Sequence, residues 1–236
     1  MREFMRTGQV AMVALAFALS GCGGGGGVSS TPAPAPTPAP TPMPTPVPTP
    51  TPTPVSFDTA EYRRSDGPPL HGAITAWQAG ATGRGTTIAI VDSGIDAVSP
   101  EFAGRISDAS TDVVGSRGIG NADDDHGNQV ALVAAAARNN TGVMGMAWDA
   151  TIQMLRADTA GSCTESDGCT FSDTAIASGI DAALRAGARV VNLSLGGDPA
   201  NAALRATVAR ATAAGLVVVV SAGNDGDSTE AGVDPA

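Results

Sequence analysis

Two ionisable side chains stand at positions where a protein can use them for chemistry, and the first is Asp92. It ends a short apolar run, 88–91, that is preceded by Gly83 and Gly85 and followed by Gly94. A run of this length, apolar on both faces and bounded by turn formers, is typical of a strand buried in a parallel sheet. Open α/β sheets place their active sites at the carboxyl ends of such strands. The same spacing would also let the carboxylate cap a turn with Gly94.

The second candidate is His126, one of two histidines in the chain, which lies just before a helix-forming run at 130–138. An imidazole changes its protonation state close to neutral pH and can therefore take part in proton transfer. His126 follows Asp92 by 34 positions, so the two can meet only if the strand end and the helix start lie side by side. Taken alone, a histidine at a helix start favours a capping or surface residue.

The segments around these residues alternate between expected helices and apolar strands. Apolar strands separated by helices indicate βαβ crossovers, in which a mostly parallel sheet is covered on both faces. We therefore expect an α/β fold. Besides the strand that ends at Asp92, strands are expected at 150–156, 190–195 and 216–220, and helices at 73–79, 130–138, 172–186 and 199–214.

Polar or glycine residues follow three of these strands. They are Asp92, the pair Gly196-Gly197, and Asn224. Because parallel strands end at one edge of a sheet, these groups should converge there, close to His126. Convergence of this kind is hard to explain by structure alone and indicates a binding or catalytic site.

The motifs around these residues resemble those of the subtilisin-like serine proteases, from about Ala73 to the end of the chain. V-D-S-G-I-D contains Asp92, D-D-H-G-N-Q-V-A contains His126, N-L-S-L-G-G contains Ser194, and V-V-S-A-G-N-D-G contains Asn224. They occur in the family's order. The resemblance implies a three-layer α/β/α fold with a mostly parallel sheet, and serine endopeptidase activity on protein or peptide substrates.

By this resemblance, His126 is the general base, Asp92 is the carboxylate that orients it, and Asn224 donates its amide to the oxyanion. The resemblance also implies that Ser194, Leu195 and Gly196 bind an extended peptide through their backbone edges. For Ser194, a satisfied core hydroxyl remains the alternative.

The sequence departs from the family's usual H-G-T-H-V-A at two positions, Asn128 and Gln129. The family often binds calcium in loops, but the stretch N-N-T-G at 139–142 is too weak a motif to assign a site. We expect no cofactor and no metal. With only two histidines in the chain, a multi-histidine metal site is not expected.

A larger departure concerns the nucleophile. The family's G-T-S-x-[SA]-x-P motif does not occur in the sequence, and Ser93, Ser194 and Ser221 lie within other motifs. We therefore expect residues 55–236 to be the N-terminal part of a subtilisin-like peptidase domain, truncated before the catalytic serine, with an incomplete sheet. The alternative function is that of a catalytically inactive, lipid-anchored surface protein that binds extended peptides.

The N-terminal region has the composition of an exported lipoprotein. Residues 1–21 combine two arginines with a ten-residue apolar core, and Leu19-Ser20-Gly21-Cys22 resembles the bacterial lipobox. An ordinary signal peptide followed by a chance cysteine is the alternative. Residues 22–54, rich in Gly and then in Thr-Pro, are expected to be a disordered linker.

These features together resemble the autotransporter subtilases of Gram-negative bacteria, which implies lipidation at Cys22 and a place at the outer membrane or cell surface. The remaining cysteines, Cys163 and Cys169, are expected to form a disulfide in an exported protein. The net charge of −10 argues against nucleic acid as a partner.

Overall fold

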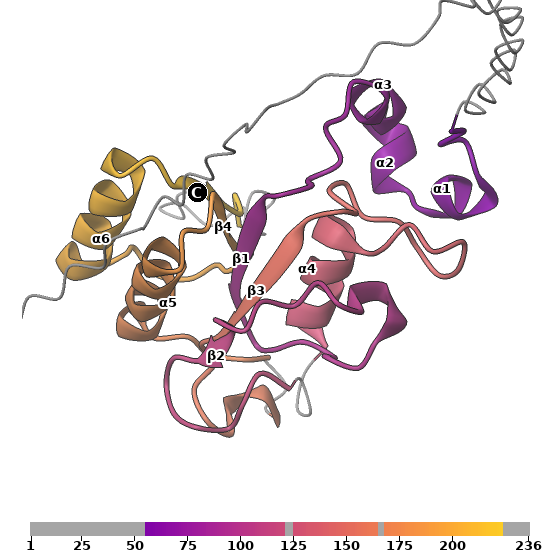
Figure 1. The fold of residues 1–236 in the computed structure, drawn as a ribbon. Helices are drawn as coiled ribbons and strands as arrows, with labels where there is room; N and C mark the ends of the chain where they lie inside the picture. The colour runs from indigo at the N-terminus through magenta and orange to yellow at the C-terminus, as the bar shows by residue number, and fades with distance from the viewer. Residues whose placement is uncertain (1–54, 121–124, 165–167, 224–236) are drawn as a thin grey trace, which may run out of the picture. The chain divides into compact units, whose positions relative to one another are not determined.

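The computed structural model describes residues 55–120, 125–164 and 168–223. These residues contain a five-stranded sheet in the order β2-β3-β1-β4-β5, and every pairing in it is parallel (Figure 1). The expected α/β class with a mostly parallel sheet is therefore confirmed. The strands are β1 (Thr87–Asp92), β2 (Thr111–Asp112), β3 (Thr151–Arg156), β4 (Val190–Leu193) and β5 (Val217–Val220).

Strand β1 lies in the middle of the sheet, between β3 and β4. Its residues Ala89, Ile90 and Val91 have no exposed surface, as expected for an apolar run covered on both faces. In its register with β3, Asp92 lies opposite Arg156. At the carboxyl end of β1, an acidic residue and a basic residue therefore lie side by side on neighbouring strands.

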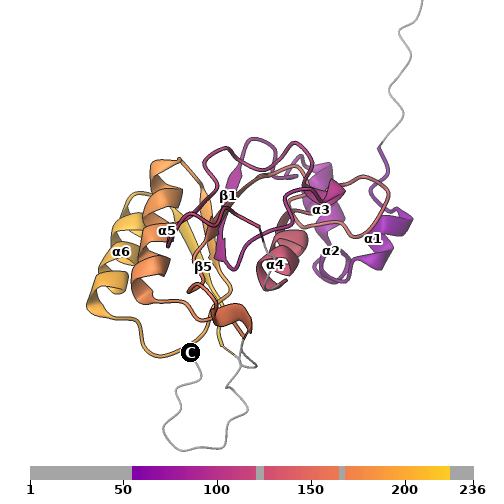
Figure 2. The same cartoon turned by 90° about the horizontal axis from the view of Figure 1, so that it is seen from below.

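Helices cover the two faces of the sheet (Figure 2). On one face, α4 (His126–Ala135) packs its alanines against Ile90, Ile152 and Met154. On the other, α5 (Asp173–Arg185) and α6 (Ala202–Ala213) bury Val91, Leu155 and Val191. The described residues therefore form the three layers that the resemblance implies.

Capping side chains explain where the helices begin. The Oγ of Ser172 accepts from the Ala175 amide at 3.2 Å, and the Oδ1 of Asn201 accepts from the Leu204 amide at 2.9 Å. The second cap makes α6 begin at Ala202, later than the expected 199. Helix α4 begins and ends earlier than the expected 130–138, and β4 ends at Leu193 instead of 195.

A group of short helices precedes β1: α1 (Ala60–Arg64), α2 (Gly67–Leu70) and the predicted α3 (Ala73–Gln78). Tyr62 and Trp77 are buried with Met144 in a small aromatic core, which Phe57 and Trp148 complete. Two 3₁₀ turns, η1 (Pro100–Phe102) and η2 (Ser162–Thr164), follow later in the chain.

None of the helices among the described residues has both the length and the apolar character that crossing a membrane requires. The predicted signal peptide, the lipidation residue Cys22 and the linker at 22–54 lie outside the described residues, and so does Asn224.

Candidate active site

Asp92 lies at the end of β1 with no exposed surface. Its Oδ1 accepts from the Ser93 amide at 2.7 Å and from the Ser93 hydroxyl at 3.3 Å. Among the described residues, its Oδ2 is buried without a hydrogen-bond partner. Burial raises the pKa of the Asp92 carboxyl above its ordinary value, although hydrogen bonds from His126 and Ser93 oppose this shift.

His126 begins α4, and its Nδ1 lies 2.9 Å from Asp92 Oδ1. Its side chain is 48% exposed, in contrast to the fully buried aspartate. An ionised carboxylate can only accept, so with Asp92 ionised this hydrogen bond assigns the N–H to Nδ1, and in the neutral imidazole the lone pair of Nε2 is then available to accept a proton. The strand end and the helix start therefore lie side by side, as a joint role of the two residues requires.

Close backbone packing holds the start of α4 against the end of β1. The Gly127 amide donates to Ser93 Oγ at 3.2 Å. A Cβ on Gly127 would collide with the carbonyl oxygen of Gly94 and would lie 3.1 Å from the Cβ of Asp92. Only glycine at position 127 allows the start of α4 to approach the end of β1 this closely. The glycine that follows His126 therefore helps to place the histidine beside Asp92.

The two residues that depart from the family motif have contacts of their own. The Oδ1 of Asn128 accepts from the Asp96 amide at 3.1 Å, so it joins α4 to the segment that follows β1. The Nε2 of Gln129 donates to Asp125 at 3.4 Å on the surface. Neither contact involves Asp92 or His126.

A pocket of about 290 Å³ lies next to the histidine. The three residues predicted to bind substrate form one of its walls, and a segment after β3 forms another. The Oγ of Ser194 accepts from the Asn192 side chain at 2.9 Å, so its hydroxyl is satisfied as well as lining the pocket. The lining residues are His126, Gly168, Cys169, Phe171, Ser194, Leu195 and Gly196.

The structure contains a disulfide between Cys163, in η2, and Cys169, in the second wall of the pocket. The predicted oxyanion donor Asn224 and the lipidation residue Cys22 are not among the described residues, so the structure does not place them.

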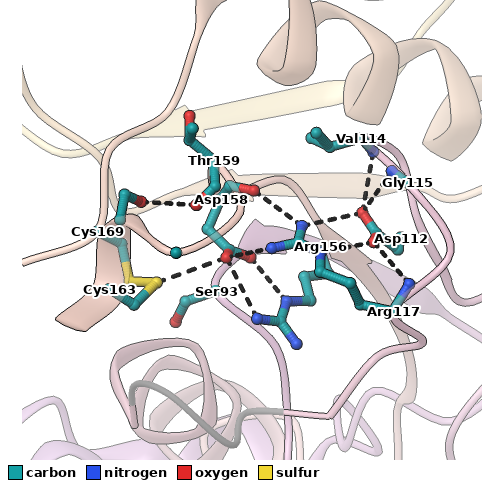
Figure 3. Close-up of polar contacts among 12 residues, drawn as sticks. Ser93, Asp112, Val114, Gly115, Arg117, Arg156, Asp158, Thr159, Cys163 and Cys169 are labelled. Carbon is teal, nitrogen blue, oxygen red and sulfur yellow. Dashed lines mark hydrogen bonds and ion pairs between the residues drawn. A yellow bond between two sulfur atoms is a disulfide. The ribbon is translucent and has the colours of Figure 1, made fainter.

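A buried ion network beside the pocket was not predicted from the sequence (Figure 3). The Asp158 carboxylate, 1% exposed, is paired with Arg156 at 2.8 Å and with Arg117 at 2.7 Å. Arg117 also forms a forked pair with Asp112 at 2.8 and 3.1 Å, which holds the pKa of Asp112 well below its ordinary value. The sequence places Arg156 and Asp158 at and just after the end of the apolar strand β3, but nothing in it points to Arg117 or Asp112 as their partners.

Hydrogen bonds fix the loop at 139–142, whose N-N-T-G sequence is too weak a motif to assign a calcium site. The amides of Asn139 and Asn140 donate to Glu61 Oε1 at 3.0 and 3.1 Å, while among the described residues the buried Glu61 Oε2 has no hydrogen-bond partner. The Oδ1 of Asn139 accepts from the Thr141 hydroxyl at 2.6 Å. In the described part of the chain, no group of three or more His, Cys, Asp or Glu side chains could hold a metal ion.

Burial and the charge of Glu61 raise the pKa of the neighbouring Glu101, which accepts from the Asn139 side chain at 3.2 Å. The role of Glu61 in fixing this loop was also missed from the sequence, where a glutamate in a short helix carries no distinguishing pattern.

Comparison with known proteins gives matches along the same stretch of chain. The model of the subtilase family matches residues 83–236. Thermitase from Thermoactinomyces vulgaris is 39% identical over 167 residues, which cover 70% of this chain and 56% of thermitase. Subtilisin DY from Bacillus licheniformis is 36% identical over 165 residues, covering 69% of this chain and 56% of that protein.

Among solved structures, fervidolysin from Fervidobacterium pennivorans, a keratinolytic enzyme related to subtilisin, resembles this chain with a TM-score of 0.56 and 28% identity. The likeness covers 66% of this chain and 23% of fervidolysin. The chain spans 56% of thermitase and of subtilisin DY, which is little more than half of their length. Because the family match extends over well more than half of the chain and the solved structure agrees with it, the chain belongs to the subtilase family.

Proposed function

We propose that this chain is the aspartate- and histidine-bearing part of a subtilisin-type serine endopeptidase that cleaves protein or peptide substrates. One observation carries the proposal: Asp92 Oδ1 and His126 Nδ1 lie 2.9 Å apart, beside a pocket lined by 194–196. Membership of the subtilase family supports the assignment, because serine peptidase chemistry needs a histidine base oriented by a carboxylate.

In the proposed mechanism, Nε2 of His126 takes the proton of a serine hydroxyl as the serine oxygen attacks the scissile carbonyl carbon. Asp92 stays ionised and stabilises the imidazolium through Nδ1–H. The proton then passes to the leaving amine nitrogen. We assign the donor to the developing oxyanion to the side-chain amide of Asn224, and the binding of the extended substrate to Ser194, Leu195 and Gly196.

The proposal assigns the nucleophile to no residue in the sequence, since no G-T-S motif occurs in it. The 236-residue chain by itself is therefore expected not to hydrolyse peptides. Turnover of a fluorogenic peptide by the purified chain, lost in the His126→Ala variant, would contradict this expectation.

Sequencing the DNA beyond the codon for Ala236 tests the proposal. A reading frame that continues into G-T-S should yield a longer product that hydrolyses casein. In that product, Asp92→Asn should lower kcat by about 10⁴-fold, because the imidazole loses the partner that fixes its tautomer. Activity that survives both Asp92→Asn and His126→Ala would show that the roles are wrongly assigned.

A second function, binding of extended peptides without hydrolysis, is favoured by the pocket together with the missing serine motif. A stop codon directly after Ala236, with measurable binding of an unstructured peptide, would support this function over proteolysis. Hydrolysis by a longer product would exclude it.

We also propose that the protein is an exported, autotransporter-type lipoprotein, anchored through Cys22 at the outer membrane or cell surface. The support is the lipobox-like sequence and the proline-rich stretch before residue 55. Incorporation of labelled palmitate by the full chain, lost in Cys22→Ala, is the expected result. Labelling that persists in this variant would refute the anchor.

A further inference from the structure

The pocket beside His126 has two walls of different construction. The wall at 194–196 continues directly from β4. The other contains Gly168, Cys169 and Phe171, from a segment after β3 with little regular structure of its own. Its position therefore has to come from side-chain contacts and a few backbone hydrogen bonds.

Those contacts meet at Asp158 (Figure 3). Its backbone forms a bridge with Phe171, and the next residue, Thr159, donates its amide to the Thr170 carbonyl at 2.8 Å. Its Oδ2 lies 3.5 Å from Cys163 Sγ, which carries no proton because it is part of the disulfide. Asp158 thus contacts Phe171 in the wall directly, and it contacts the disulfide that joins Cys163 to the wall residue Cys169.

Two arginines fix the Asp158 side chain in turn. Arg156 approaches it with Nε at 2.8 Å and Nη2 at 3.2 Å. Arg117 binds the carboxylate at 2.7 Å and the Asp158 carbonyl at 2.8 Å. Asp112 supplies a second acid, which is paired with Arg117 at 2.8 Å.

The cluster is also joined to the strand that carries Asp92. Arg156 lies opposite Asp92 in the parallel register, and the Ala157 amide donates to the Asp92 carbonyl at 2.9 Å. Arg156 Nη1 donates to the Gly120 carbonyl at 2.5 Å, and the Ile95 amide donates to the Ile119 carbonyl at 2.8 Å. The pocket wall and the catalytic strand therefore share one buried support.

We propose that Asp158 is a positioning residue that holds residues 168–171 in place as the second wall of the pocket beside His126. Its consequence for substrate, namely that this wall contributes to binding of an extended peptide, rests on the proposed function. Replacing Asp158 by Asn removes the carboxylate from two arginines, and the side chain of Arg156 is only 4% exposed. The wall should then lose its contacts with Asp158 and Thr159 and become locally mobile, while the sheet remains folded.

Hydrogen exchange on the full-length chain tests the proposal directly. In Asp158→Asn, the amides of Thr159 and Thr170 should exchange at least tenfold faster, with the amides of β1 and β4 unchanged. Arg117→Gln, at a side chain that is 25% exposed, is the milder variant and should give the same pattern if Asp158→Asn does not fold. Asp149→Asn is the matched control, because it removes a surface pair with Arg84 at the other end of β3.

The second measurement is binding of fluorescein-labelled oxidised insulin B chain, an extended peptide, by fluorescence anisotropy. Affinity should fall about tenfold in Asp158→Asn and stay unchanged in Asp149→Asn. A residue that only stabilises the fold would not change the affinity at temperatures well below unfolding, and any faster exchange would be spread over the whole sheet.

The outcomes separate the two proposals. Unchanged exchange at Thr159 and Thr170, or faster exchange spread equally over β1, β3 and β4, overturns the positioning role. If Asp158→Asn speeds hydrogen exchange only in the wall and leaves the peptide affinity unchanged, the link to substrate binding is overturned. If the variant's faster exchange is confined to the wall but the unaltered chain binds no peptide, the positioning role stands and the proposed function fails.

Discussion

The Asp92 carboxylate has no exposed surface, and one of its oxygens has no hydrogen-bond partner among the described residues. The His126 ring and Ser93 compensate only in part, so burial dominates and the pKa of Asp92 rises. At the scale of single residues, the arrangement that suits the proposed proton transfer therefore works against the stability of the fold.

Asp92→Asn should stabilise the folded chain at neutral pH by about 1 kcal/mol. A carboxyl whose pKa is raised on folding contributes stability below its unfolded pKa, near 3.8, and loses that contribution as the pH rises through the folded pKa. The variant's advantage should therefore appear above the folded pKa of Asp92 and vanish at low pH. Urea unfolding across pH measures it, with the exposed Asp108→Asn as the control; equal stability at all pH values would refute the prediction.

Asp112 behaves in the opposite sense, because its pKa is held below the ordinary value by Arg117 and by backbone amides. Asp112→Asn should destabilise the chain by about 3 kcal/mol at neutral pH, since it breaks a buried ion pair. The contribution of Asp112 is present above its unfolded pKa and is lost as the pH falls through the folded pKa. Chemical denaturation at pH 7 that shows no loss would argue against the network as a stabilising unit.

At the scale of elements, the contact between β1 and α4 decides the geometry of the candidate site. Gly127 lets the helix start approach the strand end at backbone distance, while Gly94, with a φ of 122°, leaves room for the backbone of Ile119 and Gly120. The Ser93 hydroxyl bridges them by accepting from Gly127 and donating to Asp92.

Gly127→Ala should force α4 away from β1 and separate His126 from Asp92. We expect a loss of about 1–3 kcal/mol in the free energy of unfolding, as is usual when a methyl group is added to a packed site. Gly67→Ala in α2 is the matched control, because a Cβ there meets nothing within 4 Å. NMR signals of the two histidines report the separation, and an unchanged His126 signal in Gly127→Ala would contradict it.

The elements around the candidate site were predictable because their signals are local. Asp92 ends a bounded apolar run and His126 begins an alanine-rich helix, so residue type and position along the chain point to the same edge of the sheet. The cluster around Asp158 was not predictable, because its partner Arg117 lies 41 positions earlier, in a polar stretch without periodicity. Strand β2, with two residues, is too short to leave a pattern.

At the scale of the whole described region, a separate aromatic core joins the helices that precede β1 to the chain around 144–148. Trp77 is 2% exposed, and its Nε1 donates to the Met146 carbonyl at 2.9 Å. Trp148 packs against the same cluster, but among the described residues its buried Nε1 has no acceptor. The sequence contains only these two tryptophans, so each can be followed separately.

Trp77→Phe should destabilise the chain by about 1 kcal/mol more than Trp148→Phe does, because only the first removes a satisfied hydrogen bond. Both substitutions keep an aromatic ring, although Trp77 is buried and Trp148 is only half-buried. Thermal unfolding of the two variants gives the comparison. Equal losses of stability in the two variants would show that the hydrogen bond from Trp77 to Met146 does not stabilise the packing of the N-terminal helices on the chain around 144–148.

The buried carboxylate of Asp92 has a consequence for how this sequence changes over generations. Aspartate and asparagine codons differ by a single base, and by the pKa argument above the asparagine form is the more stable fold at neutral pH. A lineage released from the need for proton transfer would therefore drift toward asparagine at position 92, gaining stability as it did so. Finding aspartate retained there in independent isolates would mean that selection still acts on the chemistry of this position and not only on the fold.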